Sequence, residues 1–535
     1  MKRNKLFAGK TAALCSLSAL CVLSGTFLTQ AAGWTQEGEN WCYYDNYGDR
    51  VTNEWRKSAK GFWFWLDDNG LMVKNAVVDD GEHYYYVNED GAMSTNRWVS
   101  CDPEVIGEDG GEDVWLYFGA NGRAYKDTGS EKGFVEKTIN GKRYAFNENG
   151  RMLTGLVSGD GEMLDEGEEE SFLEAEYYFG GSSDGAMQVN GWYLYDGSSD
   201  ADSNVSGISY SDYDNLWLYF GSNGKKVIAE TGKERKEKTI NGQKYVFDEN
   251  GVMLSEWAGT ASASSAASTK YYSSSMDGHM KKNRWVYAVP DEEMDPEDYA
   301  DDQARWFYSG SNGRVYKNGI KTVNGKKYMF DENGIMLSGF VITDENNKPV
   351  GTIDAEEYGR EDFLKGDAAE KISGGELYYF GADEAGDGSM KTGKTVRIEL
   401  SDDTYTFGFA STGKAYGTDG VELVSSRYYQ NGLMLQADRD SKYGIVKDQD
   451  GKLIAVGTSG TKQTGNGKAL RDGNGGYILL KDNAYFAYVE TDDRPLYQDG
   501  AFYEYDESAS GHKGAEISQD TEGSDIPKDL KLNFE

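Results

Sequence analysis

The chain has 535 residues and a formal net charge of −36 at pH 7, with 13% aromatic residues, 38 tyrosines and 68 glycines. A chain this acidic is a poor candidate for nucleic-acid binding, because phosphate contacts need clusters of lysine and arginine. A parallel α/β enzyme is also disfavoured, since its strands would be rich in leucine, valine and isoleucine and would alternate with helical patterns.

The first 32 residues have the pattern of a secretory signal peptide. Four basic residues precede or begin an apolar stretch over residues 11–28, and Ala31 and Ala32 offer a small-residue cleavage point. An uncleaved membrane anchor is the alternative, which the shortness of the apolar stretch disfavours. The sequence therefore predicts a secreted protein with no membrane span after removal of the signal.

One pattern recurs three times in the middle of the chain. It reads TINGKRYAFNENGRMLTG from Thr138, TINGQKYVFDENGVMLSE from Thr239 and TVNGKKYMFDENGIMLSG from Thr322. Asn140-Gly141 predicts a type I′ turn, because both central residues of that turn need φ > 0. Tyr144 and Phe146 then alternate with other residues at the period of a strand with one apolar face. A second turn at Gly150 is expected to lead into a return strand.

Two other hairpin patterns accompany each copy in a fixed order. One starts with tryptophan, at Trp115, Trp217 and Trp306, and the other starts with paired tyrosines, at Tyr84, Tyr177 and Tyr271. A lone hairpin is marginal in water, so neighbouring hairpins are expected to cover one another's aromatic faces. The predicted fold is an all-β solenoid of stacked β-hairpins, with a small β-rich cap or module at the C-terminal end.

The repeat pattern divides the chain into three predicted segments. Residues 1–32 are the signal peptide, residues 33–437 are the hairpin repeats, and residues 438–535 are a divergent β-rich module with a polar tail. Acidic insertions near Asp160, Pro290 and Asp354 are expected between hairpins, as solvated loops. Weak calcium binding by their carboxylates is the alternative, although they lack the spacing of an EF-hand.

Catalytic and metal-binding patterns are sparse in this sequence. It contains three histidines and neither the HExxH, CxxC nor P-loop pattern. Residues Gly181 to Gly185 fit the nucleophile-elbow pattern, but they lie in a predicted hairpin loop and not in a strand-to-helix turn. We therefore predict a non-enzymatic protein without a catalytic residue, metal or cofactor. Cys42 and Cys101 follow the signal segment, and the sequence leaves open whether they pair.

The aromatic positions carry a family resemblance. The stretch GWTQEGENWCYYDNYGDRVTNEW resembles the choline-binding-type, cell-wall-binding repeats of Gram-positive surface proteins. The TINGKKY pattern resembles repeats of clostridial toxin tails and of streptococcal glucan-binding proteins. The resemblance covers nearly everything from Trp34 to Ala437. It implies hairpins that stack into a β-solenoid, with aromatic residues of successive hairpins caging choline or lining sugar sites.

The resemblance also implies a set of ligand-binding residues. Carried over by position, they are Trp34, Trp41, Tyr43, Trp55, Trp63, Trp98, Trp115, Trp192, Trp217, Trp285 and Trp306. Pairs such as Trp98 with Trp115 are expected to meet across a junction between hairpins. The alternative is that the tryptophans are simply the core. Three copies depart from the Gly-Trp pattern, namely Gly155-Leu156, Glu256-Trp257 and Gly339-Phe340.

These observations predict a secreted, non-catalytic protein at the cell surface or in the cell wall. Its partner would be a cell-wall polymer or polysaccharide, choline-bearing or glucan-like, bound non-covalently through aromatic grooves between repeats. Weak sites repeated along one chain gain affinity through multivalency. One alternative is an adhesin or toxin-tail-like lectin for host or extracellular glycans. Another is an envelope hydrolase with a cryptic site in the C-terminal module.

Overall fold

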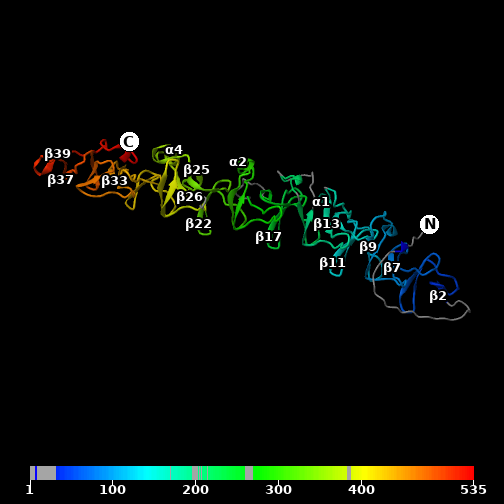
Figure 1. The fold of residues 1–535 in the computed structure, drawn as a ribbon. Helices are drawn as coiled ribbons and strands as arrows, with labels where there is room; N and C mark the ends of the chain where they lie inside the picture. Colours follow the sequence, from blue (N-terminus) through cyan, green and yellow to red (C-terminus); the bar gives the residue numbers. More distant parts are fainter. Residues whose placement is uncertain are drawn as a thin grey trace. The chain divides into compact units, whose positions relative to one another are not determined.

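The computed structural model describes residues 7–8, 32–168, 170–195, 203, 205, 208–213, 215–259, 269–381 and 387–534. The predicted signal peptide lies outside these ranges, apart from Phe7–Ala8 and residue 32. The chain divides into two compact units. Unit 1 comprises Met1–Gly259 with Ser273–His279, and unit 2 comprises Thr260–Tyr272 with Met280–Glu535. Each unit consists of antiparallel β-hairpins that follow one another in chain order (Figure 1), which confirms the predicted all-β fold of repeated hairpins.

The strands of unit 1 are short and pair with close neighbours in the sequence. The pairs are β2–β3, β4–β5, β6–β7, β8–β9, β10–β11, β12–β13, β14–β15 and β16–β17, with β1 added to β6 and β18 added to β17. Their bounds are β1 (Phe7–Ala8), β2 (Gly33–Glu37), β3 (Asn40–Tyr44), β4 (Glu54–Lys57), β5 (Trp63–Leu66), β6 (Ala76–Asp79), β7 (Tyr84–Val87), β8 (Arg97–Cys101), β9 (Val114–Phe118), β10 (Val135–Ile139), β11 (Lys142–Phe146), β12 (Gly155–Ser158), β13 (Ala175–Phe179), β14 (Gly191–Tyr195), β15 (Leu216–Phe220), β16 (Lys236–Ile240), β17 (Gln243–Phe247) and β18 (Met253–Leu254).

Unit 2 continues the same arrangement and adds a larger sheet. The sheets are β19–β20, β21–β22–β23, β25–β24–β26, β27–β28–β31–β30–β29, β32–β33, β34–β35–β36 and β37–β38–β39. Their bounds are β19 (Arg284–Ala288), β20 (Arg305–Ser309), β21 (Gly319–Val323), β22 (Lys326–Phe330), β23 (Met336–Leu337), β24 (Gly339–Thr343), β25 (Pro349–Ile353), β26 (Glu376–Phe380), β27 (Lys394–Glu399), β28 (Thr404–Phe409), β29 (Glu422–Val424), β30 (Arg427–Gln430), β31 (Leu433–Met434), β32 (Tyr443–Lys447), β33 (Leu453–Gly457), β34 (Lys468–Arg471), β35 (Tyr477–Lys481), β36 (Ala484–Val489), β37 (Leu496–Gln498), β38 (Ala501–Tyr505) and β39 (Lys513–Ile517).

Helices are short and lie in the connections between strands. The α-helices are α1 (Ser171–Glu174), α2 (Pro296–Ala300), α3 (Arg360–Lys365) and α4 (Asp367–Ile372). The single 3₁₀ turns are η1 (Pro103–Ile106), η2 (Tyr210–Asp212), η3 (Trp257–Gly259), η4 (Ser510–His512) and η5 (Lys528–Leu530). Among the described residues, no helix is both long enough and apolar enough to cross a membrane.

The Asn-Gly turns form as the sequence predicts. Asn140 has φ of 51° and Gly141 has φ of 83°, so both central residues are left-handed. The turn sets the register of β10 and β11, in which Ile139 pairs with Lys142 and Thr138 with Arg143. Because the side-chain period is two, this register places Tyr144 and Phe146 on one face.

The second turn of each copy depends on a polar side chain that was not predicted to have a role. The side-chain oxygen of Asn147 accepts hydrogen bonds from the backbone N–H of Asn149 (3.1 Å) and of Arg151 (2.8 Å). Asp248 and Asp331 do the same in the other copies. The predicted return strand is correspondingly short, a single bridge at Met152 and the two-residue strands β18 and β23.

Strand pairing corrects the predicted hairpin boundaries. Strand β9 pairs with β8 across residues 102–113, with Trp98 opposite Tyr117. Strands β14 and β15, and β19 and β20, pair in the same way. The prediction that each tryptophan-first strand opens its own hairpin is therefore wrong, since the glycine turn after β9 closes only the bridge Phe118–Ala124. The acidic insertions near Asp160 and Pro290 consequently lie within hairpins, as the loops of β12–β13 and β19–β20, whereas the one near Asp354 connects β25 to β26.

Described residues in three hairpin loops contact the repeats. Each loop of the β8–β9, β14–β15 and β19–β20 hairpins reaches the turn of the following hairpin, where an asparagine at one fixed position binds it. The hydrogen bonds run from Asn149 Nδ2 to Glu108 Oε1 (3.4 Å), from Asn250 Nδ2 to the Tyr210 hydroxyl (3.0 Å) and from Asn333 Nδ2 to the Met294 carbonyl (2.5 Å). The interpretation of the insertion near Pro290 as a solvated loop is therefore incomplete.

A buried lysine ties another insertion to the repeat. Lys226 takes the position of Ala124 and Val315 in the equivalent turns, and its ammonium donates to the carbonyls of Phe172 (2.5 Å) and Leu173 (3.2 Å) in α1. Burial lowers the Lys226 pKa to about 8. Helix α1 is thus held in place by the next hairpin.

The core of unit 2 runs through the predicted domain boundary at residue 437. One cluster of buried side chains includes Phe340, Leu435, Val446 and Ile454. Packing is therefore continuous on both sides of that position, and a separate C-terminal module stays a prediction. In unit 1, Cys42 and Cys101 are both buried and both free thiols.

Candidate functional site

Five tryptophans occupy one equivalent position, the second residue of the first strand of a hairpin. We call them the inner tryptophans: Trp34, Trp55, Trp98, Trp192 and Trp285. Each is paired in register with an aromatic residue on the second strand, respectively Tyr43, Trp65, Tyr117, Tyr219 and Tyr308. The hairpin register therefore brings two large rings together on one face.

The following hairpin adds further rings to three of these positions. The Trp98 ring centroid lies 4.9 Å from that of Tyr144 and 5.8 Å from that of Phe146. The corresponding distances are 4.9 and 5.7 Å from Trp192 to Tyr245 and Phe247. They are 4.8 and 6.1 Å from Trp285 to Tyr328 and Phe330. We call these three four-ring groups the aromatic clusters.

The aromatic clusters are partly core and partly surface. Phe146, Phe247 and Phe330 are fully buried, whereas the inner tryptophans are half-buried. Edge-to-face pairs such as Trp98 with Tyr144, at an interplanar angle of 63°, add about 0.5–1.5 kcal/mol each beyond the area they bury. A half-buried tryptophan packed against buried rings keeps an accessible apolar edge where two successive hairpins meet. We call this junction the seam.

The first repeats form similar contacts. The Trp34 ring lies 5.4 Å from Tyr43 and 5.2 Å from Phe64 of the next hairpin. The Trp55 ring lies 5.3 Å from Trp65 and 4.9 Å from Tyr85.

A second series of tryptophans lies near the start of the second strand of the same hairpins. We call these the outer tryptophans: Trp41, Trp63, Trp115, Trp217 and Trp306. The expectation that Trp98 meets Trp115, or Trp285 meets Trp306, across a junction between hairpins is wrong. They belong to opposite strands of one hairpin, and Trp285 and Trp306 contact edge-to-face at 6.2 Å.

Three tyrosines are among the residues that do meet the inner tryptophans from the following hairpin: Tyr144, Tyr245 and Tyr328. The sequence reading named none of them as a site residue. The sequence does contain a signal for them, the tyrosine that recurs two positions before phenylalanine in each TxNGxxYxF copy. Strand register, which places this tyrosine on the face toward the previous hairpin, is what identifies it.

Two of the three departures from the Gly-Trp pattern close the seam. Leu156 and Phe340 replace tryptophan and are fully buried. Phe363 of α3, also fully buried, packs on Phe340 with ring centroids 5.0 Å apart. The insertion in that hairpin therefore covers the face that an inner tryptophan leaves partly open elsewhere.

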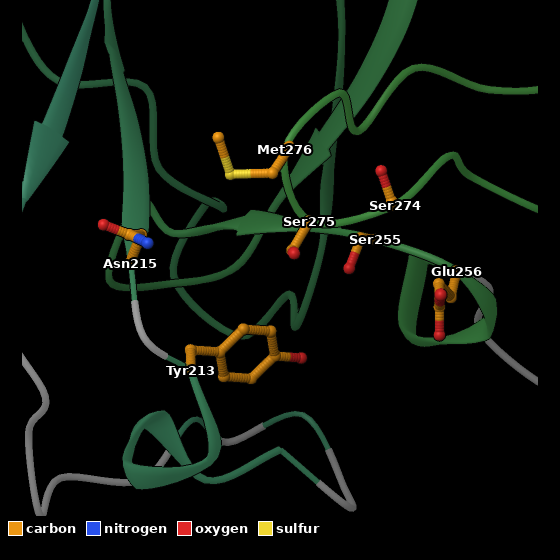
Figure 2. Close-up of a pocket in the computed structure, with 7 residues that line it drawn as sticks. All are labelled: Tyr213, Asn215, Ser255, Glu256, Ser274, Ser275 and Met276. Atoms are coloured by element: carbon orange, nitrogen blue, oxygen red, sulfur yellow. The ribbon is translucent and has the colours of Figure 1, made fainter.

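The third departure, at Glu256-Trp257, borders a polar pocket of about 360 Å³ in unit 1 (Figure 2). Its lining residues are Tyr213, Asn215, Ser255, Glu256, Ser274, Ser275 and Met276. Figure 2 shows Tyr213 on one side and the three serines on the other. Glu256 has φ of 49°, where the other two departing copies have glycine. Hydroxyl, amide and carboxylate groups suit the hydroxyls of a polyol more than an apolar ligand.

Residues 57–98, which hold Trp63 and Trp98, match the model of the choline-binding repeat family. The resemblance to choline-binding-type repeats is therefore confirmed at the level of the repeat. Glucosyltransferase-S of Streptococcus mutans serotype c is 26% identical over 307 residues, which cover 57% of this chain and 16% of the relative. Glucosyltransferase-I of Streptococcus downei is 24% identical over 491 residues, covering 84% of this chain and 26% of the relative. The chain thus spans a minor part of the curated relatives it matches.

Solved structures from Streptococcus pneumoniae are also similar. The modular autolysin LytC, in complex with a synthetic peptidoglycan ligand, has 17% identity and a TM-score of 0.33, covering 60% of this chain and 53% of that chain. Choline binding protein F has 16% identity and a TM-score of 0.29, covering 72% of this chain and 99% of that chain.

Proposed function

We propose that the protein is a secreted, non-catalytic binding protein that attaches non-covalently to a cell-wall polymer or polysaccharide. The observation that carries this proposal is the aromatic cluster, built three times with ring distances that agree to within a few tenths of an ångström. In this proposal the hairpins stack as a solenoid, and each seam with an inner tryptophan is one weak site.

The chemistry of the seam supports two ligand classes. The electron-rich face of tryptophan attracts a quaternary ammonium such as choline, with about 0.5–2 kcal/mol per contact. The same apolar ring can pack on the C–H face of a sugar, which removes apolar area from water at about 25 cal/mol per Å². The match to the choline-binding repeat supports the first class, and the match to streptococcal glucosyltransferases supports the second.

The proposed binding residues are the inner and outer tryptophans together with Tyr43. Multivalency supplies the affinity, because each bound seam raises the effective concentration of polymer at the next one. A chain with a net charge of −36 would repel a strongly anionic polymer at long range, so neutral or cationic groups are the better partners.

A retention experiment tests the proposal. The full chain is incubated separately with purified cell wall and with soluble dextran, and free choline chloride is added as competitor. Retention on wall that choline releases indicates choline recognition, and retention by dextran that choline does not release indicates glycan recognition. Binding to neither would reject the proposal, and release of labelled wall fragments over time would show an envelope hydrolase instead.

The polar pocket beside Glu256 favours the lectin alternative, in which the target is a host or extracellular glycan. Its three serine hydroxyls, Asn215 and Glu256 can bind sugar hydroxyls, which choline lacks in such number. Glu256→Gly restores the residue type of the other departing copies and removes the carboxylate. Under the lectin alternative this change weakens retention on glycan and leaves retention on wall unaltered.

A further inference from the structure

Hairpin β19–β20 exposes a pair of aromatic rings. Tyr287 and Trp306 are register partners on the two strands, so their side chains lie on the same face. Their ring centroids are 4.8 Å apart with an interplanar angle of 40°. Tyr287 is 60% exposed and Trp306 is 45% exposed. Aromatic pairs across two strands stabilise a sheet, and this pair in addition leaves adjoining apolar surface open to solvent, where a ligand can bind.

The equivalent hairpins have no second ring at this position. The residues opposite the other outer tryptophans are Gln36, Lys57, Ser100 and Leu194. Trp63 is similarly exposed, at 40%, but the Lys57 ammonium lies 5.5 Å from its ring centroid and already occupies that side. Among the five outer tryptophans, only Trp306 has an aromatic residue as its register partner.

The surroundings hold this pair in place. Arg305, which precedes Trp306, donates from Nε and Nη2 to the carboxylate of Asp298 in α2, at 2.6 and 2.5 Å. Asp298 is buried, and the same loop is fixed by the bond from Asn333 to Met294. On the same face of the hairpin, Trp285 contacts Trp306 edge-to-face. A binding surface that is already ordered loses less conformational entropy when a ligand arrives.

The shape of the pair discriminates between the ligand classes of the proposed function. A quaternary ammonium is bound well when several rings enclose and desolvate it, and at an exposed site its contact is worth only about 0.5–1 kcal/mol. The two rings touch at a tilt of 40° and keep exposed outer faces and edges, and such apolar ring surface can pack on the flat C–H face of a pyranose. The net charge of −36 further disfavours a polyanion and leaves a neutral glycan as the fitting partner.

We propose that Tyr287 and Trp306 form a stacking platform for a pyranose unit of a neutral glycan, so that hairpin β19–β20 recognises sugar in preference to choline. This inference rests on the proposed function and assigns one of its two ligand classes to one hairpin. Tyr287 is then the residue that sets the specificity, since Leu194 takes its place beside Trp217 in the otherwise similar hairpin β14–β15.

The experiment measures ligand binding at Trp306 directly, through the resonance of a fluorotryptophan at that position. The full chain is labelled with fluorotryptophan, the Trp306 resonance is assigned with Trp306→Phe, and isomaltotriose and choline chloride are titrated separately. The Trp306 resonance is expected to shift with isomaltotriose at lower concentration than with choline. Tyr287→Leu, which copies the native residue of β14–β15, is expected to weaken the sugar response roughly three- to tenfold.

Two control variants match this change. Tyr299→Leu removes another exposed aromatic side chain, 52% exposed in α2, and is expected to leave the Trp306 response unaltered. Leu194→Tyr places a ring beside Trp217 and is expected to create a sugar response there. Circular dichroism of each variant shows whether the hairpins remain folded.

Several outcomes would overturn the inference. They are a Trp306 resonance that responds to choline and not to isomaltotriose, or a Tyr287→Leu variant with an unchanged sugar response. If other tryptophan resonances shift with either probe while Trp306 does not, the proposed function stands and the platform is rejected. If no tryptophan responds to either probe and the chain is not retained on wall or dextran, both are rejected.

Discussion

The Trp192 ring lies 4.9 Å from the Tyr245 ring of the following hairpin, at an interplanar angle of 65°. Trp98 with Tyr144 and Trp285 with Tyr328 repeat this geometry almost unchanged. The contact joins two hairpins that are separate in the sequence, so it serves both to stack the repeats and to shape each seam.

Binding should depend on these tryptophans collectively. A single Trp192→Phe change keeps a ring in the cluster and is expected to lower retention on wall or dextran only modestly. Phenylalanine at positions 98, 192 and 285 together is expected to lower retention far more than the single change, because fewer sites then contribute to multivalent binding. Thermal unfolding is followed on the same variants. If retention falls only in step with the melting temperature, the tryptophans are core and the ligand site lies elsewhere.

In several turns a glycine lies against a methionine of the preceding hairpin, and this contact should prevent larger residues from replacing the glycine. Gly224 has φ of 85°, and a Cβ added there would overlap the sulfur of Met187. Gly224→Ala is expected to destabilise unit 1 by roughly 2–3 kcal/mol, from the left-handed backbone and from displaced packing. Gly242→Ala is the matched control, because Gly242 has φ of 82° and open space around it. Equal losses of stability in urea unfolding would contradict the packing contribution.

The buried carboxyl of Asp248 should make unit 1 less stable as the pH rises from about 4 to 6. Asp248 is fully buried, and burial raises its pKa to about 6, whereas an unfolded aspartate has a pKa near 3.9. The folded state therefore holds the proton more tightly, and its extra stability, at most roughly 3 kcal/mol, is present below about pH 4 and is lost as the pH rises through 6.

The Asp248 prediction has a natural control, since Asn147 occupies the same position in the preceding copy. Asp248→Asn keeps an acceptor for the turn and cannot ionise. Urea unfolding between pH 4 and 7 should show the decline in the native chain and its loss in the variant. Parallel pH profiles for the two proteins would contradict the assignment.

Lys226 should act in the opposite direction at alkaline pH. Burial lowers its pKa to about 8, and an unfolded lysine has a pKa near 10.4. Because the unfolded chain binds more protons between these values, the free energy of unfolding should rise as the pH increases from about 8 to 10. Lys226→Val introduces the residue type that Val315 has at the equivalent position of the third copy. This variant should lack the rise in the free energy of unfolding that the native chain shows. A difference between the two proteins that does not vary with pH would refute the prediction.

Much of this architecture could be predicted from local sequence. Asn140-Gly141 and its equivalents predicted the hairpin turns, and the alternation around Tyr144 predicted which face is apolar. Those features depend on neighbouring residues alone. The pairing of β8 with β9 does not, because residues 102–113 separate the strands and no local pattern indicates that the chain returns.

The candidate site was predictable to a lesser extent for the same reason. Tryptophan positions were found because they recur, but their partners were assigned to the wrong strand. Tyr144 contacts Trp98 only once both hairpin registers are fixed. No pattern in the sequence indicated that Lys226 is buried, because its burial depends on contact with α1, some fifty residues earlier in the chain.

The position of the insertions has a consequence for how such a chain can change. Where they are the loops of individual hairpins, their length and sequence can vary without altering the register of β8–β9, β14–β15 or β19–β20. Lengthening a flexible loop twofold costs only about 0.6 kcal/mol of closure entropy. Each repeat can therefore acquire its own surroundings beside a common aromatic framework, and neighbouring repeats can diverge in preference while the framework that joins them stays the same.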